Sequence, residues 1–233
     1  MKTKYSLILP CFNEYGNLKL LLPELLKVFK GKKHEFIIVD DNSEDQTAHR
    51  LKKLFKNKTQ IKYIVRKKNR SLGLSIKDGI LKSKGNTIIV MDTDFNHRPK
   101  DLKVMLSNFT KKNYNMVCGS RFLKGGGSTS TFRYICSYVF NIFVNFITRG
   151  NITDNLSGFF IIEKKFLKIN LKKIFYGYGD FYIRLLFFMQ KKSISIKEVP
   201  VKYDARKYGV SKSKLVKMFI SYFIETIKVT IRN

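Results

Sequence analysis

Two aspartates, Asp92 and Asp94, flank Thr93 directly after the apolar run 87–91. This spacing lets both carboxylates reach one cation, and carboxylate oxygens are ligands that Mg²⁺ and Mn²⁺ accept alongside the phosphate oxygens of a substrate. Two acidic side chains this close repel each other unless a cation or hydrogen-bond donors offset the repulsion. The alternative is a capping role for the helix that follows, because Asp is a favourable N-cap residue. The spacing alone leaves metal ligation and capping both open.

Similar polar segments follow other apolar runs of the first half. Residues 10–14 (PCFNE) and 40–45 (DDNSED) come after two such runs, and Ser120 and Arg121 come after a third. Apolar runs bounded by loop residues are typical of buried strands. We therefore expect strands at Tyr5–Leu9, Glu35–Val39, Ile61–Val65, Thr87–Met91 and Asn115–Gly119.

Segments with helical periodicity lie between these strands. They span Tyr15–Phe29, Gln46–Phe55, Gly73–Lys82 and Pro99–Lys111. Strict alternation of strands and helices predicts an α/β fold with a mostly parallel sheet covered by helices on both faces. Ligands of such sheets bind beyond the carboxyl ends of the strands, where the polar segments gather.

The second half is less regular. Strands are expected at Gly158–Ile162 and Ile194–Val199, with a helix at Asp180–Gln190 between them. Two further segments, 132–148 and 212–233, combine an apolar stripe with flanking cations. Both patterns fit a helix that lies in a membrane interface, and both also fit a helix packed on the core.

Length and composition indicate a globular chain. With 233 residues, 44% hydrophobic and 14% aromatic, the sequence supports one domain spanning 1–233 and excludes disorder as a description of the whole. The formal net charge of +29 points to a polyanionic partner. Nucleic acid and an anionic membrane surface would both attract such a chain, and cations that only solvate the surface are a third explanation.

The cysteine pattern argues against a disulfide framework and against a zinc site. Cys11, Cys118 and Cys136 are odd in number and lack paired Cys or Cys/His spacing, so a reducing cytoplasm fits best. The chain opens without the pattern of a signal peptide, and no run of 18 apolar residues occurs in the sequence.

Several segments together resemble the inverting family 2 glycosyltransferases, and more narrowly the branch that makes dolichyl-phosphate (polyprenyl-phosphate) mannose and glucose. They are PCFNE (10–14), VDDNSEDQT (39–47), GLSIKDG (73–79), MDTDFNHRP (91–99), GSRFLKGGG (119–127), DNLSGFF (154–160) and VPVKYDARKYGVSK (199–212). The resemblance implies a GT-A, Rossmann-like fold. It also implies a nucleotide-sugar-binding half at 1–120 and an acceptor-binding half with interfacial helices at 121–233.

The resemblance also assigns roles to individual residues. For the donor nucleotide they are Pro10, Phe12, Glu14, Val39, Asp41, Asp92 and Thr93, and for the metal they are Asp92, Asp94 and Asn96. Asn96 stands where the family often has Gln, one methylene longer. The donor and acceptor phosphates are assigned to Arg121, Arg133, Arg206 and Lys212. The catalytic group implied by the resemblance comprises Asp92, Asp94, Arg121 and Arg206. The two arginines suit this role because guanidinium groups bind phosphate through two parallel hydrogen bonds.

The implied reaction is inverting transfer of mannose or glucose from GDP-mannose or UDP-glucose to a polyprenyl phosphate, with Mg²⁺ or Mn²⁺ as cofactor. The implied location is the cytoplasmic face of a membrane, and the participation of a separate membrane subunit stays open. One alternative is transfer to a sugar or lipid hydroxyl, for which Asp154 or Asp180 would serve as base. The other is a non-catalytic basic module for membrane or nucleic acid, although the chain lacks nucleic-acid-binding motifs and nucleic acid is not an expected partner.

Overall fold

The computed structural model describes residues 4–111, 114–168, 170–205, 207–208 and 215–231. Its centre is a seven-stranded sheet in the order β3-β2-β1-β4-β7-β5-β8. The strands are β1 (Tyr5–Cys11), β2 (His34–Asp40), β3 (Ile61–Val65), β4 (Thr87–Val90), β5 (Met116–Ser120), β7 (Phe160–Glu163) and β8 (Ile196–Pro200). The strands expected from the sequence are all present, with ends shifted by no more than one or two residues.

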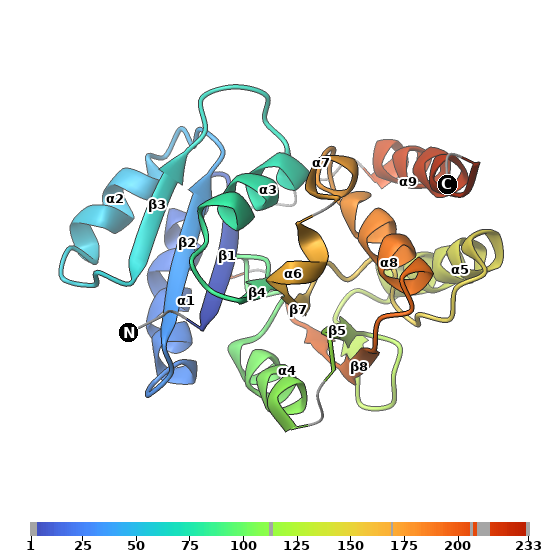
Figure 1. The fold of residues 1–233 in the computed structure, drawn as a ribbon. Helices are drawn as coiled ribbons and strands as arrows, with labels where there is room; N and C mark the ends of the chain where they lie inside the picture. Colours follow the sequence, from blue (N-terminus) through green and yellow to red (C-terminus); the bar gives the residue numbers. More distant parts are fainter. Residues whose placement is uncertain (1–3, 112–113, 169, 206, 209–214, 232–233) are drawn as a thin grey trace.

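Helices cover both faces of the sheet (Figure 1). In the first half they are α1 (Tyr15–Val28), α2 (Thr47–Leu54), α3 (Leu72–Lys82) and α4 (Pro99–Lys111). Along β1, Leu7 and Leu9 pack into the cluster shared with α1, α2 and α4, whereas Ile8 packs into the cluster shared with α3. This division follows from the period of two in a strand, which sends successive side chains to opposite faces.

Helix α3 packs unusually close to β1. A Cβ atom added to Gly79 would lie 2.5 Å from a side-chain carbon of Ile8, so a larger residue would push the helix away from the sheet. At the other end of the helix, the N–H of Ser71 donates to the Asp41 carboxylate at 2.7 Å, which holds the start of α3 beside the carboxyl end of β2.

The sheet is mixed, which the alternation of strands and helices did not predict for the second half. Strand β7 pairs antiparallel with both β4 and β5, while the other paired strands run parallel. The short helices α6 (Lys164–Leu167) and α7 (Leu171–Ile174) and the longer α8 (Phe181–Lys191) follow β7. The apolar content of β7 gives no indication of its direction, because buried parallel and antiparallel strands have similar sequences.

A second small sheet joins two segments far apart in the sequence. Strand β6 (Gly127–Ser128) pairs in parallel with β9 (Lys202–Tyr203). Each strand has only two residues, too few for any periodicity, so the sequence does not predict them. The pairing brings the glycine-rich segment 125–127 next to the segment that follows β8.

Helices α5 (Thr131–Thr148) and α9 (Leu215–Ile231) lie at the side of the molecule far from α1 and α2 (Figure 1). Val144 and Tyr222 form a small buried cluster with Ile183 of α8, so one side of each helix packs on the protein. Another side of each helix exposes apolar side chains, and Phe146 is 81% exposed. Within the described residues, none of the helices is both long and apolar enough to cross a membrane.

Candidate functional site

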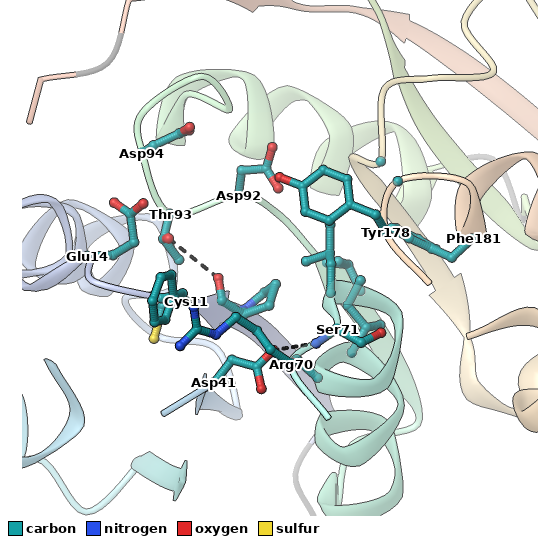
Figure 2. A pocket seen from close by; sticks show the side chains of 18 of the residues that line it. Cys11, Glu14, Asp41, Arg70, Ser71, Asp92, Thr93, Asp94, Tyr178 and Phe181 are labelled. Carbon is teal, nitrogen blue, oxygen red and sulfur yellow. Dashed lines mark hydrogen bonds between the residues drawn. The ribbon is translucent and has the colours of Figure 1, made fainter. Parts of the chain in front are cut away.

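A pocket of about 490 Å³ opens at the carboxyl ends of β1, β2 and β4 (Figure 2). Loops from the first half form one side of it, and residues of the second half, among them Ser157, Tyr178 and Tyr222, form the other. The sequence-predicted residues that line the pocket are Pro10, Phe12, Glu14, Asp41, Asp92, Thr93 and Asp94. The structure therefore brings together side chains that are separated by more than eighty positions in the chain.

The loops after β1 and β2 are tied to each other. Asn13 adopts a left-handed backbone conformation (φ 54°), and its N–H donates to the Ser43 hydroxyl at 2.9 Å. The Asn13 side-chain oxygen accepts a hydrogen bond from the Glu44 N–H at 2.8 Å. These bonds hold the two loops at one edge of the sheet, where Phe12 and Glu14 reach the pocket.

The two adjacent aspartates after β2 have different roles. The Asp40 carboxylate accepts from the backbone N–H groups of Ser43 and Ala48, each at 2.8 Å, and so holds the start of α2. Asp41 lines the pocket, where its carboxylate accepts from Arg66 at 2.5 Å and from the Ser71 N–H at 2.7 Å. Adjacent side chains at the end of a strand point in opposite directions, so of these two aspartates only Asp41 faces the pocket.

Two arginines at this site were not predicted from the sequence. The Arg66 side chain is only 8% exposed, and its guanidinium bonds to Asp41 and, at 2.8 Å, to Asp78. The Arg70 guanidinium lies 3.5 Å from the centre of the Phe12 ring and lines the pocket. Both belong to the cation-rich segment RKKNR at 66–70, and among 46 lysines and arginines nothing in the sequence marks these two.

The paired carboxylates stand in the loop after β4. The Asp92 side chain is 43% exposed, whereas Asp94 is almost fully buried. The Asp94 carboxylate accepts hydrogen bonds from the Asn96 backbone N–H at 3.0 Å and from the Asn96 side-chain amide at 2.9 Å. These contacts shape the loop itself rather than the start of α4, and they direct the Asn96 amide to Asp94.

The donor set suits a hard divalent cation. Two carboxylates two residues apart line a pocket that also has room for a ligand, and Mg²⁺ is usually bound by one or two carboxylates together with substrate phosphates. Among the described residues, no group of three or more His, Cys, Asp or Glu side chains is arranged to hold a metal. A cation at Asp92 and Asp94 would take its other ligands from a bound substrate, from water or from the Asn96 side-chain oxygen.

A buried histidine supports the loop of the paired carboxylates. His97 is 1% exposed, and its Nδ1 accepts a hydrogen bond from the Asp92 backbone N–H at 2.8 Å. Burial lowers the pKa of His97 to about 4, although the negative charge of Asp94 acts in the opposite direction. His97 is consequently neutral near pH 7 and does not neutralise the carboxylate pair.

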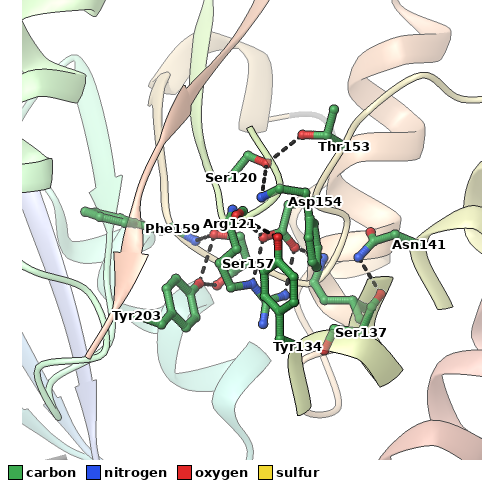
Figure 3. A network of polar contacts seen from close by, with 12 residues as sticks. Ser120, Arg121, Tyr134, Ser137, Asn141, Thr153, Asp154, Ser157, Phe159 and Tyr203 are labelled. Atoms are coloured by element: carbon green, nitrogen blue, oxygen red, sulfur yellow. Dashed lines mark hydrogen bonds and ion pairs between the residues drawn. The ribbon is translucent and has the colours of Figure 1, made fainter. Parts of the chain in front are cut away.

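Arg121 forms a buried ion pair with Asp154 (Figure 3). Its Nε and Nη2 atoms each donate to the Asp154 carboxylate at 2.8 Å, and Asp154 is fully buried. Burial acts to lower the pKa of Arg121, but the charge of Asp154 more than offsets it and the pKa is raised. Arg121 does not line the pocket in this arrangement, and its role with phosphate stays a prediction.

Both acids considered as bases for a hydroxyl acceptor are held in ion pairs. Asp154 is paired with Arg121, and Asp180 is paired with the buried Arg184 at 2.6 Å. Neither carboxylate lines the pocket. The geometry therefore gives both acids a structural role.

The remaining predicted residues lie outside the pocket lining. Val39 is fully buried in the core between β2 and α3, and its side chain does not line the pocket, so its role in nucleotide binding stays a prediction. Arg133 is exposed in the first turn of α5. Arg206 and Lys212 fall outside the described residues.

Comparison with protein families gives a match to "Glycosyl transferase family 2" over residues 6–169, more than half of the chain. The chain belongs to glycosyl transferase family 2. Similar curated proteins and solved structures extend the match beyond those residues.

Three curated proteins are similar to this family 2 chain over most of its length. A dolichol-phosphate mannosyltransferase of Pyrococcus furiosus is 30% identical over 91% of the chain, and the aligned part is 59% of that protein. A dolichol-phosphate mannosyltransferase of Saccharomyces cerevisiae is 27% identical over 98% of the chain and 87% of the relative. A dolichyl-phosphate beta-glucosyltransferase of Dictyostelium discoideum is 29% identical over 85% of the chain and 65% of the relative.

Among solved structures, the family 2 chain is similar to glucosyl-3-phosphoglycerate synthase of Mycobacterium tuberculosis, crystallised with Mn²⁺, UDP and phosphoglyceric acid. The TM-score is 0.74 at 14% identity, with coverage of 98% of the chain and 78% of that protein. At this identity the likeness establishes the fold. The expectation of a GT-A α/β fold with a mostly parallel sheet is confirmed.

Proposed function

We propose that the protein transfers a hexose, mannose or glucose, from a nucleotide-diphosphate sugar to a polyprenyl phosphate of the dolichyl type. The observation that carries this proposal is a single pocket lined by Asp92 and Asp94 together with Phe12, Glu14 and Asp41. An aromatic ring and acceptor groups suit a nucleotide, and the carboxylate pair suits a metal on its diphosphate. The relatives named as dolichol-phosphate and dolichyl-phosphate transferases support the acceptor class.

The proposed acceptor explains why the site needs no strong base. A phosphate monoester has a second pKa of about 6, so it is largely ionised near neutral pH. One of its oxygens attacks the anomeric carbon, the bond from that carbon to the diphosphate oxygen breaks, and the configuration inverts. The protein's task is to hold two anionic groups in line and to exclude water from them.

Mg²⁺ or Mn²⁺ at Asp92 and Asp94 would supply positive charge to the leaving diphosphate. Among the chain's own residues, Thr93 and Pro10 line the pocket next to the pair, and Phe12 contributes an aromatic side chain to the same lining. We keep Asn96 as a proposed metal ligand and Arg121, Arg133, Arg206 and Lys212 as proposed phosphate contacts. The division into a donor half at 1–120 and an acceptor half at 121–233 is part of the same proposal.

The donor is tested by thermal unfolding with a nucleotide panel. GDP, UDP, GDP-mannose and UDP-glucose are compared at equal concentration, with Mg²⁺, with Mn²⁺ and with EDTA. A ligand present at about 100 times its dissociation constant adds about 2.7 kcal/mol to folding stability. We expect one nucleotide to raise the Tm only when the metal is present, and a panel without any metal-dependent shift would contradict the proposal.

The acceptor is tested with the nucleotide sugar selected in this way. We expect formation of a lipid-linked sugar phosphate with polyprenyl phosphate and no product with a free oligosaccharide at equal concentration. Product on the oligosaccharide alone would instead support the family 2 alternative in which a sugar hydroxyl is the acceptor.

We also propose that α5 and α9 dock on the cytoplasmic face of a membrane containing anionic lipid, as the lipid substrate requires. Apolar side chains repeat at spacings of three and four along α5 and so share one exposed face: Phe132, Ile135, Val139, Ile142 and Phe146. Ile220 and Ile224 are exposed on α9, whose Phe223 stacks on Phe143 of α5. The cations Arg133, Arg149 and Lys228 are exposed on or beside the two helices and complement anionic headgroups.

Vesicle flotation tests the docking surface. We expect binding that rises with anionic lipid, falls at high salt and weakens at least about tenfold in a Val139→Ser, Phe146→Ser double variant. The matched control changes Leu81 and Val104, which are exposed on α3 and α4, to Ser. If the control weakens binding as much as the α5 variant, or if the wild-type protein stays unbound at low salt, the docking proposal is wrong.

A further inference from the structure

His97 contacts its own loop at Asp92 and two distant segments, 157–159 and Tyr203, which meet it only in the folded protein. Its Nδ1 accepts from the Asp92 backbone N–H at 2.8 Å. Its Nε2 lies 2.7 Å from the Tyr203 hydroxyl oxygen and 3.2 Å from the Ser157 carbonyl oxygen. Its ring is stacked on Phe159, with the ring centres 4.4 Å apart and the planes 9° from parallel. A buried imidazole with a partner at each nitrogen and a ring on its face has one orientation.

The hydrogen bonds also assign the protons. Because the Asp92 N–H donates to Nδ1, that nitrogen carries no hydrogen, and the neutral ring carries its proton on Nε2. Nε2–H then donates to the Tyr203 oxygen, and the Tyr203 O–H donates to the Ser157 carbonyl oxygen at 2.6 Å. A continuous set of bonds therefore runs from the backbone of a pocket carboxylate to Ser157, which itself lines the pocket.

Tyr203 connects this set of bonds to the acceptor half. It is the second residue of β9, which pairs with Gly127 and Ser128 of β6. The Arg121 guanidinium lies 4.8 Å from the centre of the Tyr203 ring, so the buried ion pair of Arg121 packs on the same side chain (Figure 3). His97 thus lies between the carboxylate pair and the segment that carries the glycine-rich strand.

We propose that His97 is a positioning residue for Asp92 and that Tyr203 holds His97 in place. The position of the carboxylate pair is thereby linked to the position of the β6–β9 sheet. The proposal rests on the proposed function, in which Asp92 binds a metal. Its physical basis is that the hydrogen bond to His97 fixes the backbone N–H of Asp92. Because the carboxylate belongs to the same residue, a fixed backbone leaves the Asp92 side chain fewer orientations. Partners that orient metal ligands typically change metal affinity about 10–100-fold when they are removed.

Two variants of His97 separate the contributions of its two nitrogens to Mn²⁺ binding. In His97→Asn the side-chain oxygen can take the place of Nδ1 and accept from Asp92, but the side chain is too short to reach Tyr203. In His97→Gln the amide nitrogen can take the place of Nε2, and nothing replaces Nδ1. Mn²⁺ binding is measured by the EPR signal of free Mn²⁺, in the presence of whichever of GDP or UDP raises the Tm of the wild-type protein. We expect Mn²⁺ affinity to fall about tenfold in His97→Gln and by no more than about threefold in His97→Asn.

A tyrosine pair tests the second half of the proposal. Tyr203→Phe keeps the ring and removes the hydroxyl that holds Nε2, the same contact that His97→Asn loses, and we expect Mn²⁺ affinity to fall by about two- to threefold. Tyr134→Phe is the matched control, because the Tyr134 hydroxyl contacts the Arg121 carbonyl oxygen at 3.5 Å and does not bond to His97. The control is expected to keep the wild-type affinity.

The Tm of each variant without metal reports on packing alone. The proposal is supported if His97→Gln loses more affinity than His97→Asn, and if Tyr203→Phe loses more affinity than Tyr134→Phe. Equal loss in both His97 variants, or unchanged affinity in His97→Gln and Tyr203→Phe, would overturn it and leave His97 a packing residue. If the wild-type protein fails to bind Mn²⁺ both in the presence of GDP and in the presence of UDP, the proposed function is contradicted, and this inference with it.

Discussion

Replacing Asp92 or Asp94 by Ala is expected to lower the rate of sugar transfer by at least about a hundredfold. Each carboxylate is proposed to hold the metal that neutralises the leaving diphosphate, a contribution of several kcal/mol to the transition state, and each 1.36 kcal/mol corresponds to a tenfold rate change. The measurement is the initial rate of lipid-linked product formation with saturating metal. Retention of more than about a tenth of the activity would remove the residue from the proposed site.

The fold is expected to survive both substitutions. The Asp92 side chain is 43% exposed, and removing one of two adjacent negative charges relieves repulsion when no metal is bound. Glu44→Ala is the matched control, because Glu44 is exposed in the neighbouring loop after β2 and does not line the pocket. The control should transfer sugar at the wild-type rate. Without metal, the Tm of Asp92→Ala and of the control should be close to that of the wild-type protein, and the Tm of Asp94→Ala should be lower because this substitution removes the acceptor of two Asn96 hydrogen bonds.

Asp154→Ala is expected to destabilise the protein by about 3–5 kcal/mol, because it leaves the guanidinium of Arg121 buried without its counter-charge. Arg121 is 8% exposed and Asp154 fully buried. The Asp154 carboxylate also accepts the Arg121 backbone N–H at 3.0 Å and that of Leu156 at 3.2 Å, so the substitution breaks the turn as well. The free energy of unfolding is measured by chemical denaturation.

The control makes the same substitution in an exposed ion pair. Asp204 lies 3.6 Å from Arg98, and its side chain is 52% exposed, so Asp204→Ala should change the free energy of unfolding by less than about 1 kcal/mol. If Asp154→Ala is no more destabilising than this control, the Arg121–Asp154 pair does not hold the structure. The assignment of Arg121 to substrate phosphate would then be the stronger explanation for its position.

Local sequence patterns determined the strands, the helices and the edge of the sheet at which the pocket lies. Burial of β1 needs a run of apolar residues, and a polar segment such as 10–14 must follow where the strand leaves the core. Both requirements act on neighbouring residues, so they are visible without a structure. The same reasoning places Asp41, Asp92 and Asp94 at one edge, because parallel strands end together.

The tertiary structure decided everything that depends on residues distant in the sequence. The direction of β7 follows from how its chain returns between β4 and β5, and apolar content carries no information about it. Arg121 finds its partner 33 positions away, and His97 finds Tyr203 106 positions away. In a chain with a formal charge of +29, the residue type alone does not distinguish an arginine or lysine that pairs with a buried carboxylate from one that faces water. Only packing separates the two, since it fixes which charges lose their water and must find a partner.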